Sequence, residues 1–170
     1  MFVFSCYTGL SFADASNLKP DNLNRGIDGR LWITIHRQKT DVKSQIPLLP
    51  KAIEIIEAYK NHPKSKRYGT LLPMLSNQRF NSYMKEIGVI TNINKNLTHH
   101  LARHTFATTV CIQNGITFDA LKGMLGHASI RTTQIYGKVL PKRISMEMDI
   151  LFEKFNKEKG GGLGFIREAQ

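Results

Sequence analysis

Side chains that together support chemistry at a phosphoryl group are spread through the second half of the chain. His100, Arg103 and His127 precede Tyr136 in this order. A phenol is a poor nucleophile toward phosphate unless cations neutralise the phosphoryl oxygens and neighbouring groups move its proton. Because arginine, histidine and tyrosine supply these parts, the set predicts nucleophilic attack on a phosphate by the Tyr136 hydroxyl.

His100 and Arg103 are three residues apart, so on a helix they share one face and can reach the same ligand. A guanidinium can hold two phosphate oxygens at once, which a lysine cannot do. A histidine can donate to a third oxygen or move a proton near neutral pH. The alternative for this pair is a surface arginine beside a histidine that is satisfied within the core.

His127 and Tyr136 each have an ordinary alternative. Gly126 before His127 predicts a helix end, which leaves the histidine free to point into a cleft or to cap the helix C-terminus. A single tyrosine is more typical of a core or surface position than of a nucleophile. The order and spacing of the whole set favour a site.

The composition indicates a polyanionic partner. Lysine and arginine number 24 against 13 acidic residues, and the isoelectric point is about 9.8. Such an excess most often indicates nucleic acid, although a protein can also be basic without binding one. The chain has no carboxylate pair, Cys/His cluster or nucleotide-binding loop of the GxxxxGK[ST] type, so we expect no metal, ATP or other small-molecule cofactor.

The two cysteines, Cys6 and Cys111, lie in apolar stretches without CxxC spacing, which is typical of buried thiols in the reducing cytoplasm. No apolar run approaches the roughly 20 residues needed to span a bilayer, so we expect no membrane partner. Residues 1–12 lack the basic start and cleavage site of a signal peptide and resemble a core element entered midway. We therefore expect a fragment whose N-terminal portion is missing.

The first third of the chain predicts two short helices and a small antiparallel sheet. Residues 1–8 fit a buried helix that Gly9 ends, and residues 11–18 fit a second helix. The Asp28-Gly29 pair favours a hairpin turn, and β-forming residues follow at 31–36. A second strand is expected near 43–48.

After Pro50 the pattern becomes helical. The predicted elements are helices at 52–59, 77–87, 98–113 and 117–125, a basic loop at 62–69, a short helix from Ser129 that carries Tyr136, and an amphipathic helix at 141–157. Glycines at 160–164 predict a break. The sequence thus indicates a mostly α-helical α+β fold, with one domain over residues 1–158 and a flexible tail over 159–170.

Two segments carry a resemblance to a known family. HLARHTFAT around Arg103 and LGHASIRTTQIYGKV around Tyr136 resemble the two C-terminal signature boxes of the tyrosine site-specific recombinases, the phage integrase family. The resemblance spans roughly residues 2 to 140. It implies the catalytic-domain fold of tyrosine recombinases and type IB topoisomerases, which an N-terminal DNA-clamping domain normally completes. It also implies DNA cleavage and rejoining through a 3′-phosphotyrosyl intermediate.

The resemblance assigns roles to individual residues. It implies Tyr136 as the nucleophile, Lys39 as the acid that protonates the departing 5′ oxygen, and a transition-state group made of Arg103, His100 and His127. Thr40 and His104 are expected at the DNA, where His104 can also brace the site by hydrogen bonding.

The first signature box departs from the family. Thr8-Gly9-Leu10 with Asp14 resembles that box, but Ser11 stands where the family has an arginine. Either the domain only binds DNA, or a nearby arginine replaces the missing one. Arg37 is the candidate, because in an extended chain it shares a face with Lys39. The RQKT segment at 37–40 resembles the hairpin of integrases from conjugative transposons.

The resemblance also implies partners. It predicts double-stranded DNA and a homo-oligomer, a tetramer on DNA, and site-specific recombination or integration of a mobile element as the function. In this family the segment after the tyrosine often docks on a neighbouring protomer, so helix 141–157 is expected either to do so or to pack on its own core. The alternatives in function are a catalytically silent DNA-binding module of the same fold and a strand-relaxing topoisomerase.

Overall fold

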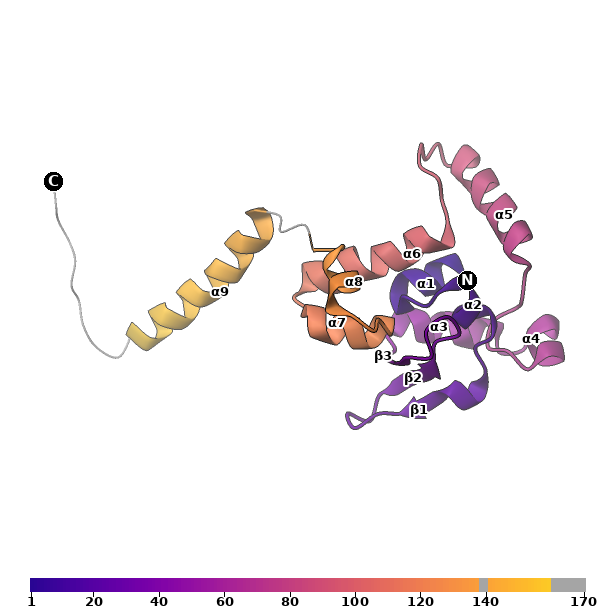
Figure 1. Ribbon diagram of the computed structural model, residues 1–170, viewed down its shortest axis with the longest axis horizontal. Helices are drawn as coiled ribbons and strands as arrows, with labels where there is room; N and C mark the ends of the chain where they lie inside the picture. The colour runs from indigo at the N-terminus through magenta and orange to yellow at the C-terminus, as the bar shows by residue number, and fades with distance from the viewer. Residues whose placement is uncertain (138–140, 160–170) are drawn as a thin grey trace. The chain divides into compact units, whose positions relative to one another are not determined.

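The computed structural model describes residues 1–137 and 141–159. Met1–Gly137 form one compact unit, and the described part of the remaining chain is helix α9, Pro141–Lys159 (Figure 1). The predicted flexible tail begins at Lys159, the last described residue, so the rest of that tail lies outside the described residues. The division into a domain over 1–158 and a tail stays a prediction.

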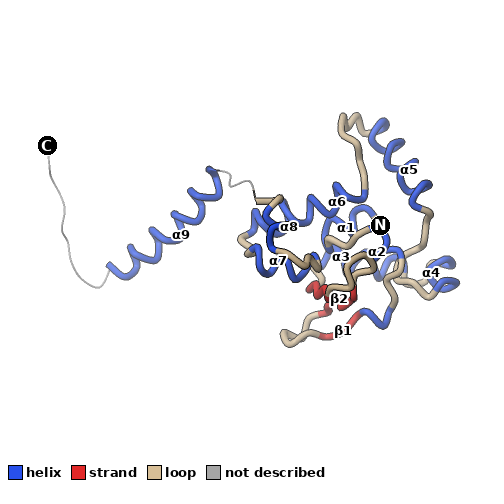
Figure 2. The backbone as a smooth tube through the Cα atoms, in the orientation of Figure 1, coloured by secondary structure: helices blue, strands red, loops and turns tan. Residues whose placement is uncertain are grey.

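A three-stranded antiparallel sheet lies at one side of the compact unit, with the helices gathered at the other (Figure 2). Its strands, in the order β1-β2-β3, are β1 (Leu23–Arg25), β2 (Leu31–His36) and β3 (Lys43–Pro47). Ile33 pairs with Ile46 across β2 and β3, and both are fully buried, as the alternating pattern requires. The two predicted strands are confirmed. The short strand β1 was not predicted.

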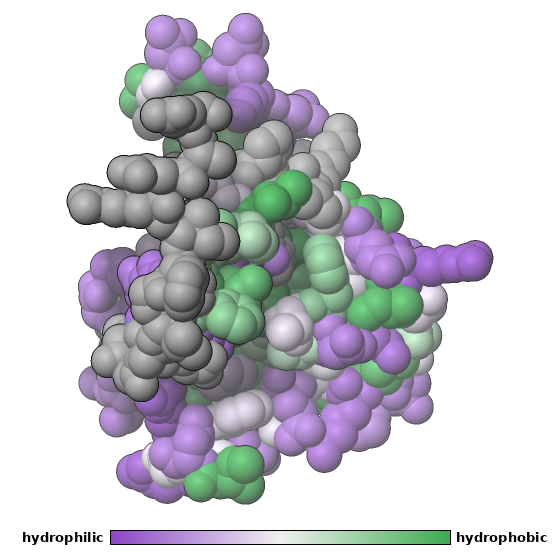
Figure 3. All heavy atoms as spheres, turned by 90° about the vertical axis from the view of Figure 1, so that its left-hand side faces the viewer, coloured by the Kyte–Doolittle hydropathy of each residue, from purple (hydrophilic) through white to green (hydrophobic). Residues whose placement is uncertain are grey.

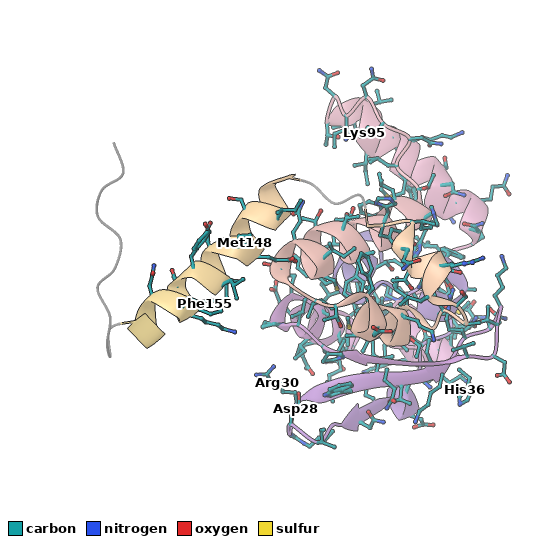
Figure 4. All side chains as sticks on the ribbon, turned by 60° about the vertical axis from the view of Figure 1, so that its left-hand side comes forward. Asp28, Arg30, His36, Lys95, Met148 and Phe155 are labelled. Atoms are coloured by element: carbon teal, nitrogen blue, oxygen red, sulfur yellow. The ribbon has the colours of Figure 1, made fainter. Side chains whose placement is uncertain are left out.

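The turn before β2 is fixed by Asp28. Its Oδ1 accepts hydrogen bonds from the Trp32 indole nitrogen at 2.8 Å and from the Arg30 backbone nitrogen at 3.1 Å. Figure 4 shows Asp28 and Arg30 at this end of β2 and His36 at the opposite end. The hairpin turn predicted from Asp28-Gly29 is therefore confirmed, and β2 leads from it toward the arginine-bearing turn described below.

The helices of the compact unit follow the sequence signals closely. They are α1 (Phe2–Thr8), α2 (Phe12–Ser16), α3 (Pro50–Tyr59), α4 (Pro63–Tyr68), α5 (Asn77–Ile90), α6 (His99–Thr105), α7 (Phe118–Leu125) and α8 (Ile130–Gln134). A short 3-10 turn, Pro20–Asn22, precedes β1. After α6 the chain continues through a wider π-helical segment, Phe106–Cys111, and a 3-10 turn, Ile112–Asn114. The predicted helix 98–113 therefore forms, but its second half changes its hydrogen-bonding pattern.

Side-chain caps explain where several of these helices begin. Ser11, Ser76, Thr98, Thr117 and Ser129 each accept a hydrogen bond from a backbone N–H in the first turn of the helix that follows. At the other end, the glycines that follow α1 and α7 adopt left-handed backbone angles. These caps confirm the predicted starts of α2, α6, α7 and α8, and the glycines confirm the predicted ends of α1 and α7.

Two predictions about the middle of the chain were wrong. The predicted basic loop at 62–69 is largely helix α4, because Pro63 occupies the first helical position and Gly69 ends the helix in a left-handed conformation. Helix α5 runs through Gly88 to Ile90 instead of stopping at the glycine. Gly88 is buried and its backbone is not in the left-handed region, so the chain continues as a helix through it.

The core lies where α1, α7 and the sheet meet. Its largest fully buried apolar side chains come from these three and from the connecting segments: Phe4, Leu10, Leu18, Ile33, Ile46, Leu72, Leu121 and Leu125. Pairs of elements far apart in sequence contact one another here, including α1 with α6 and α7 with β3. Figure 3 shows one face of the protein, where hydrophilic side chains surround smaller apolar areas. Packing of this kind fixes the helix ends that build the site.

Helix α9 has apolar side chains exposed along its length. The prediction of an amphipathic helix at 141–157 is confirmed. The residues of its predicted apolar side, Ile144, Met148, Leu151, Phe152 and Phe155, are exposed, as is Ile150. Met148 and Phe155 project from this helix in Figure 4.

Candidate active site

Arg103 is held by the ends of two other helices. Its side chain on α6 is 6% exposed, its Nη1 donates to the Gly9 carbonyl after α1, and its Nη2 donates to the Leu125 carbonyl at 2.6 Å. Carbonyl groups at helix C-termini lack partners within the helix and carry partial negative charge. They therefore provide two fixed acceptors for the guanidinium, and the alternative of a surface arginine is wrong.

Arg103 remains charged despite its burial. Burial lowers the pKa of Arg103 to about 10, the nearby Arg37 lowers it as well, and the charge and hydrogen bonding of Tyr136 act in the opposite direction. This pKa still lies far above neutrality, so the guanidinium carries a full positive charge at pH 7. The influence of Tyr136 places the phenol beside this guanidinium.

His127 bridges Arg103 and α8. Its Nε2 lies 3.1 Å from Arg103 Nη2, and its Nδ1 lies 2.9 Å from the Thr133 hydroxyl. The left-handed Gly126 turns the chain so that the histidine enters the interior, where it is 8% exposed. Burial first, then Arg103 and Arg37, lower the pKa of His127 to about 4. The imidazole is therefore neutral at pH 7.

Tyr136 follows α8 and packs between two histidines. Its ring is stacked on His127 at 10° with ring centres 6.3 Å apart, and His104 meets it edge-on at 5.1 Å. Its backbone nitrogen donates to the Thr133 carbonyl at 3.1 Å. Only 6% of Tyr136 is exposed. The phenol thus lies within the arginine and histidine cluster. His104 contacts its ring, and the hydrogen-bonding role predicted for His104 stays a prediction.

Arg37 reaches the same place from the turn after β2. Its Nη1 donates to the Leu125 carbonyl at 3.1 Å, the group that also accepts from Arg103. Its Nε lies 3.3 Å from Asp14 Oδ2, and the two side chains are 10% and 3% exposed. A Cβ atom at Gly126 would meet Arg37 Cδ at 2.4 Å, so a glycine is needed for this close approach. Arg37 and Arg103 are therefore neighbours.

Ser11 serves the helix that follows it. Its hydroxyl donates to Asp14 Oδ2 at 2.6 Å and accepts from the Asp14 backbone nitrogen at 3.2 Å, which makes it the cap of α2. Asp14 Oδ1 accepts from the Gln38 backbone nitrogen at 3.1 Å. The Asp14 carboxylate thus joins α2 to the turn that carries Arg37. Arg37 therefore lies close to Ser11, the position where the family has its arginine.

The electrostatics of the cluster favour an anion. Arg37 and Arg103 lie close enough that Arg37 lowers the pKa of Arg103, while Asp14 raises it to a smaller extent. Two guanidinium groups beside one carboxylate leave a net positive charge in a mostly buried setting, where screening by water is weak. An oxyanion bound beside them would relieve this repulsion.

The turn after β2 differs from its prediction. The Asp41 nitrogen donates to the Arg37 carbonyl at 2.8 Å, and Asp41 has a positive φ of 53°, so the chain from Arg37 to Lys39 is not extended. The argument that these two side chains share a strand face is therefore wrong. Arg37 turns inward while Lys39 is exposed, and the Thr40 hydroxyl makes a long contact of 3.5 Å with the Gly126 carbonyl.

His100 and Arg103 do not share an environment. His100 is exposed in the first turn of α6, whereas Arg103 is buried. A separation of three residues leaves an angle of about 60° between two side chains on a helix, which is enough to direct one outward and the other inward. The structure brings together Arg103, His127, Tyr136 and Arg37, and it leaves His100 and Lys39 at the surface.

Two side chains that matter to the geometry had no predicted role. Asp14 holds Arg37, and its sequence signal is the Ser-x-x-Asp spacing of a helix start. Thr133 holds His127, and nothing in its spacing distinguishes it from Thr132. Both contacts depend on the tertiary fold.

The alternative of a core histidine at position 100 is wrong, because His100 is exposed and the buried histidine of this helix is its neighbour His99. Its Nε2 lies 2.9 Å from the Ser5 hydroxyl, and its ring contacts Phe12 and Phe80. Burial is the largest of the influences that lower the pKa of His99 to about 4. It is a core residue beside the site.

Within residues 1–137 and 141–159, no group of three or more histidine, cysteine or acidic side chains is arranged to hold a metal ion. In the same described ranges, no helix has both the length and the apolar character needed to cross a membrane.

Comparison with known proteins adds an independent line of evidence. The family model described as "Phage integrase family" matches residues 1–143. Tyrosine recombinase XerD of Staphylococcus haemolyticus is 37% identical over 109 residues, which cover 58% of this chain and 37% of that protein. XerD of Halalkalibacterium halodurans is 46% identical over 70 residues, which cover 41% of this chain and 23% of that protein. The chain therefore spans less than half the length of these relatives.

Solved structures of recombinases share the fold. XerA recombinase matches with a TM-score of 0.63 and 26% identity over 84% of this chain and 53% of that one. The Tn1549 transposon integrase in complex with transposon right end DNA matches with a TM-score of 0.65 and 19% identity, covering 88% of this chain and 57% of that one. The predicted fold class, mostly helical with a small antiparallel sheet, is confirmed.

Proposed function

Since this chain belongs to the phage integrase family of tyrosine recombinases, we propose that it cleaves and rejoins double-stranded DNA at a specific site through a 3′-phosphotyrosyl intermediate. The observation that carries the proposal is the placement of the Tyr136 phenol in a buried cluster with Arg103 and His127. Recombination or integration of a mobile element is the corresponding biological role.

The proposed reaction begins with attack of the Tyr136 oxygen on a DNA phosphorus. A bond forms between these two atoms, the bond from phosphorus to the 5′ oxygen breaks, and the phenol proton passes to water. Arg103 and Arg37 neutralise the charge that grows on the phosphoryl oxygens. His100 adds a donor to a phosphoryl oxygen, and the neutral His127 completes the group by accepting from Arg103 and so holding the guanidinium in place. The two guanidinium groups support this assignment because they already sit side by side with excess positive charge.

Lys39 is the proposed general acid. Its ammonium gives a proton to the departing 5′ oxygen, which leaves as a hydroxyl. The exposed position of Lys39 in the turn after β2 supports this role, since the leaving oxygen belongs to a strand bound from outside. Thr40 and His104 are proposed to contact the DNA backbone nearby. A 5′-hydroxyl from a partner duplex then attacks the phosphotyrosine and reverses these steps, so no ATP is needed.

The buried Tyr136 has a consequence for the order of events. A phenol that is 6% exposed cannot meet a duplex without a local rearrangement. Tyr136 lies after the five-residue α8 and immediately before Gly137. We propose that DNA binding frees this short segment so that the phenol reaches the phosphate held by the arginines.

Covalent trapping tests the proposed function. The protein is incubated with a nicked duplex whose binding has first been verified by gel shift, and the products are separated under denaturing conditions. We expect a protein–DNA adduct with the wild type and none with Tyr136→Phe. Binding without an adduct from wild-type protein would favour the silent DNA-binding alternative. Relaxation of supercoiled plasmid without a preferred site would favour the topoisomerase.

Assembly into a homo-oligomer, a tetramer on DNA, is proposed from α9. Ile144, Met148, Leu151, Phe152 and Phe155 form an exposed apolar stripe along one side of this helix, and contact of such a stripe with water is unfavourable. We propose that a neighbouring protomer covers them. Sedimentation of the wild type with a version truncated after Lys142, both bound to DNA, tests this: we expect the truncated form to remain at a lower oligomeric state. Equal assembly of the two forms would contradict the proposal.

A further inference from the structure

Thr133 connects the two residues on either side of the proposed reaction centre. It lies in α8 and is fully buried. Its hydroxyl lies 2.9 Å from His127 Nδ1, and its carbonyl accepts the Tyr136 N–H at 3.1 Å. One residue without a charge of its own thus contacts both the imidazole and the backbone of the nucleophile.

The contacts of His127 determine where its ring proton lies. Arg103 Nη2 is 3.1 Å from His127 Nε2, and a guanidinium nitrogen can only donate. Nε2 must therefore offer its lone pair. In a neutral imidazole the proton is then on Nδ1, which faces Thr133 and donates to its hydroxyl oxygen. If the proton were on Nε2 instead, the Nε2–H group would face the N–H group of Arg103 Nη2, and two donors would oppose each other.

We propose that Thr133 is a positioning residue that fixes His127 as the Nδ1-protonated tautomer and, through it, orients Arg103. The inference rests on the proposed function for its meaning in catalysis, but the hydrogen-bond chain is a property of the folded protein. Without an acceptor at residue 133, the buried Nδ1–H would have no partner, and the ring would lose its fixed orientation. Arg103 Nη2 would then keep its hydrogen bond to the Leu125 carbonyl but lose its hydrogen bond to His127 Nε2.

The α8 helix offers a matched control. Thr132 is the same residue type one position earlier and is exposed, so Thr132→Val makes the same change of local helix propensity without touching His127. Thr133→Val removes the acceptor while keeping the shape of the side chain. Thr133→Ser restores a hydroxyl and should rescue the effect.

The experiment combines a spectroscopic and a kinetic measurement. Long-range proton–nitrogen NMR correlations on protein with nitrogen-15-labelled histidine report the tautomer of His127, which is assigned by its loss in His127→Asn. We expect the Nδ1-protonated pattern in the wild type, Thr132→Val and Thr133→Ser, and an averaged pattern in Thr133→Val. We also expect Thr133→Val to form the DNA adduct about ten-fold more slowly, with Thr133→Ser close to wild type.

The outcomes separate this inference from the proposed function. If the wild type forms no adduct, the proposed function fails. The NMR measurement of the His127 tautomer does not need DNA, so it still tests whether Thr133 positions His127. An Nε2-protonated His127 in the wild type would overturn the inference even if Thr133→Val did not fold. It would equally be overturned by a folded Thr133→Val protein that kept the wild-type tautomer or the wild-type rate.

Discussion

The buried and the exposed parts of the candidate site are built on different principles. Arg103, Arg37 and His127 are held by backbone carbonyls and side chains of other elements, so folding fixes their directions before any ligand binds. Lys39 and His100 lie at the surface. The two guanidinium groups proposed to neutralise the phosphate are therefore held in place before DNA binds, whereas Lys39, the residue proposed to move a proton, is left for the bound DNA to position.

Among the substitutions that compare the buried and exposed parts of the site, Arg103→Lys should reduce the rate of adduct formation most, because Arg103 lies in the buried part. A lysine keeps the positive charge but cannot reach both the Gly9 and Leu125 carbonyls in a planar fork. We expect the rate of adduct formation to fall about 1,000-fold. We also expect the free energy of unfolding, measured in urea, to fall by about 2 kcal/mol, because a buried acceptor loses its donor. A rate within ten-fold of wild type would show that charge alone suffices.

Lys39→Ala should separate rate from stability. Its side chain is exposed, so we expect the free energy of unfolding to change by less than about 0.5 kcal/mol. The rate of strand cleavage should fall by about a few hundred-fold, as for loss of a general acid. A substrate with sulfur in place of the 5′ leaving oxygen needs no proton on departure, since a thiol is a far stronger acid than an alcohol. Failure of that substrate to restore the variant would remove Lys39 from this role.

Arg37→Ala tests whether this residue replaces the arginine missing at Ser11. We expect cleavage to fall about 100-fold, with a smaller loss of stability than for Arg103→Lys because Asp14 keeps its contacts with Ser11 and Gln38. The double variant Ser11→Arg/Arg37→Ala, which returns an arginine to the family's position, should recover part of the rate. Unchanged cleavage in Arg37→Ala would show that Arg37 does not replace the missing arginine.

Local signals predicted most of the fold. Thr98, Thr117 and Ser129 cap helices as expected, because an N-cap hydrogen bond closes within three residues and needs no partner from elsewhere. Strand β1 was missed, because three residues carry too little pattern. Helix α4 was missed because its basic composition outweighed the signal from Pro63 at its start.

The sequence predicted which residues belong to the candidate site but did not predict how they are arranged in space. Spacing grouped His100 with Arg103, yet packing of α6 against α1 buries one and exposes the other. The inward turn of Arg37 depends on Asp14 and on the Leu125 carbonyl, which is 88 residues away in sequence. Contacts of this kind are set by tertiary structure, so residue spacing cannot reveal them.

The smallest predicted effect concerns His99, a buried histidine outside the cluster. Because its folded pKa is about 4 against 6.5 in the unfolded chain, the unfolded state binds more protons as the pH falls through this range. Wild-type stability should therefore be highest above pH 6.5 and decrease toward pH 4. His99→Gln should reduce that pH-dependent loss by about 2 kcal/mol, and His127, whose pKa is also lowered by burial, contributes to the loss that remains. Urea unfolding of the wild type and of His99→Gln at pH 7 and pH 4.5 measures the pH-dependent loss of stability in each protein. An identical loss in the two proteins would argue against a neutral buried His99.

The central claim is that the Tyr136 oxygen becomes covalently joined to a DNA phosphate. The most direct test is to trap the adduct, digest its DNA with nuclease and its protein with trypsin, and sequence the modified peptide by mass spectrometry. Cleavage after Arg131 and Lys138 releases the peptide TTQIYGK. We predict a nucleotide phosphate on Tyr136 of this peptide. A nucleotide on any other residue, or unmodified peptide throughout a verified adduct, would contradict the account.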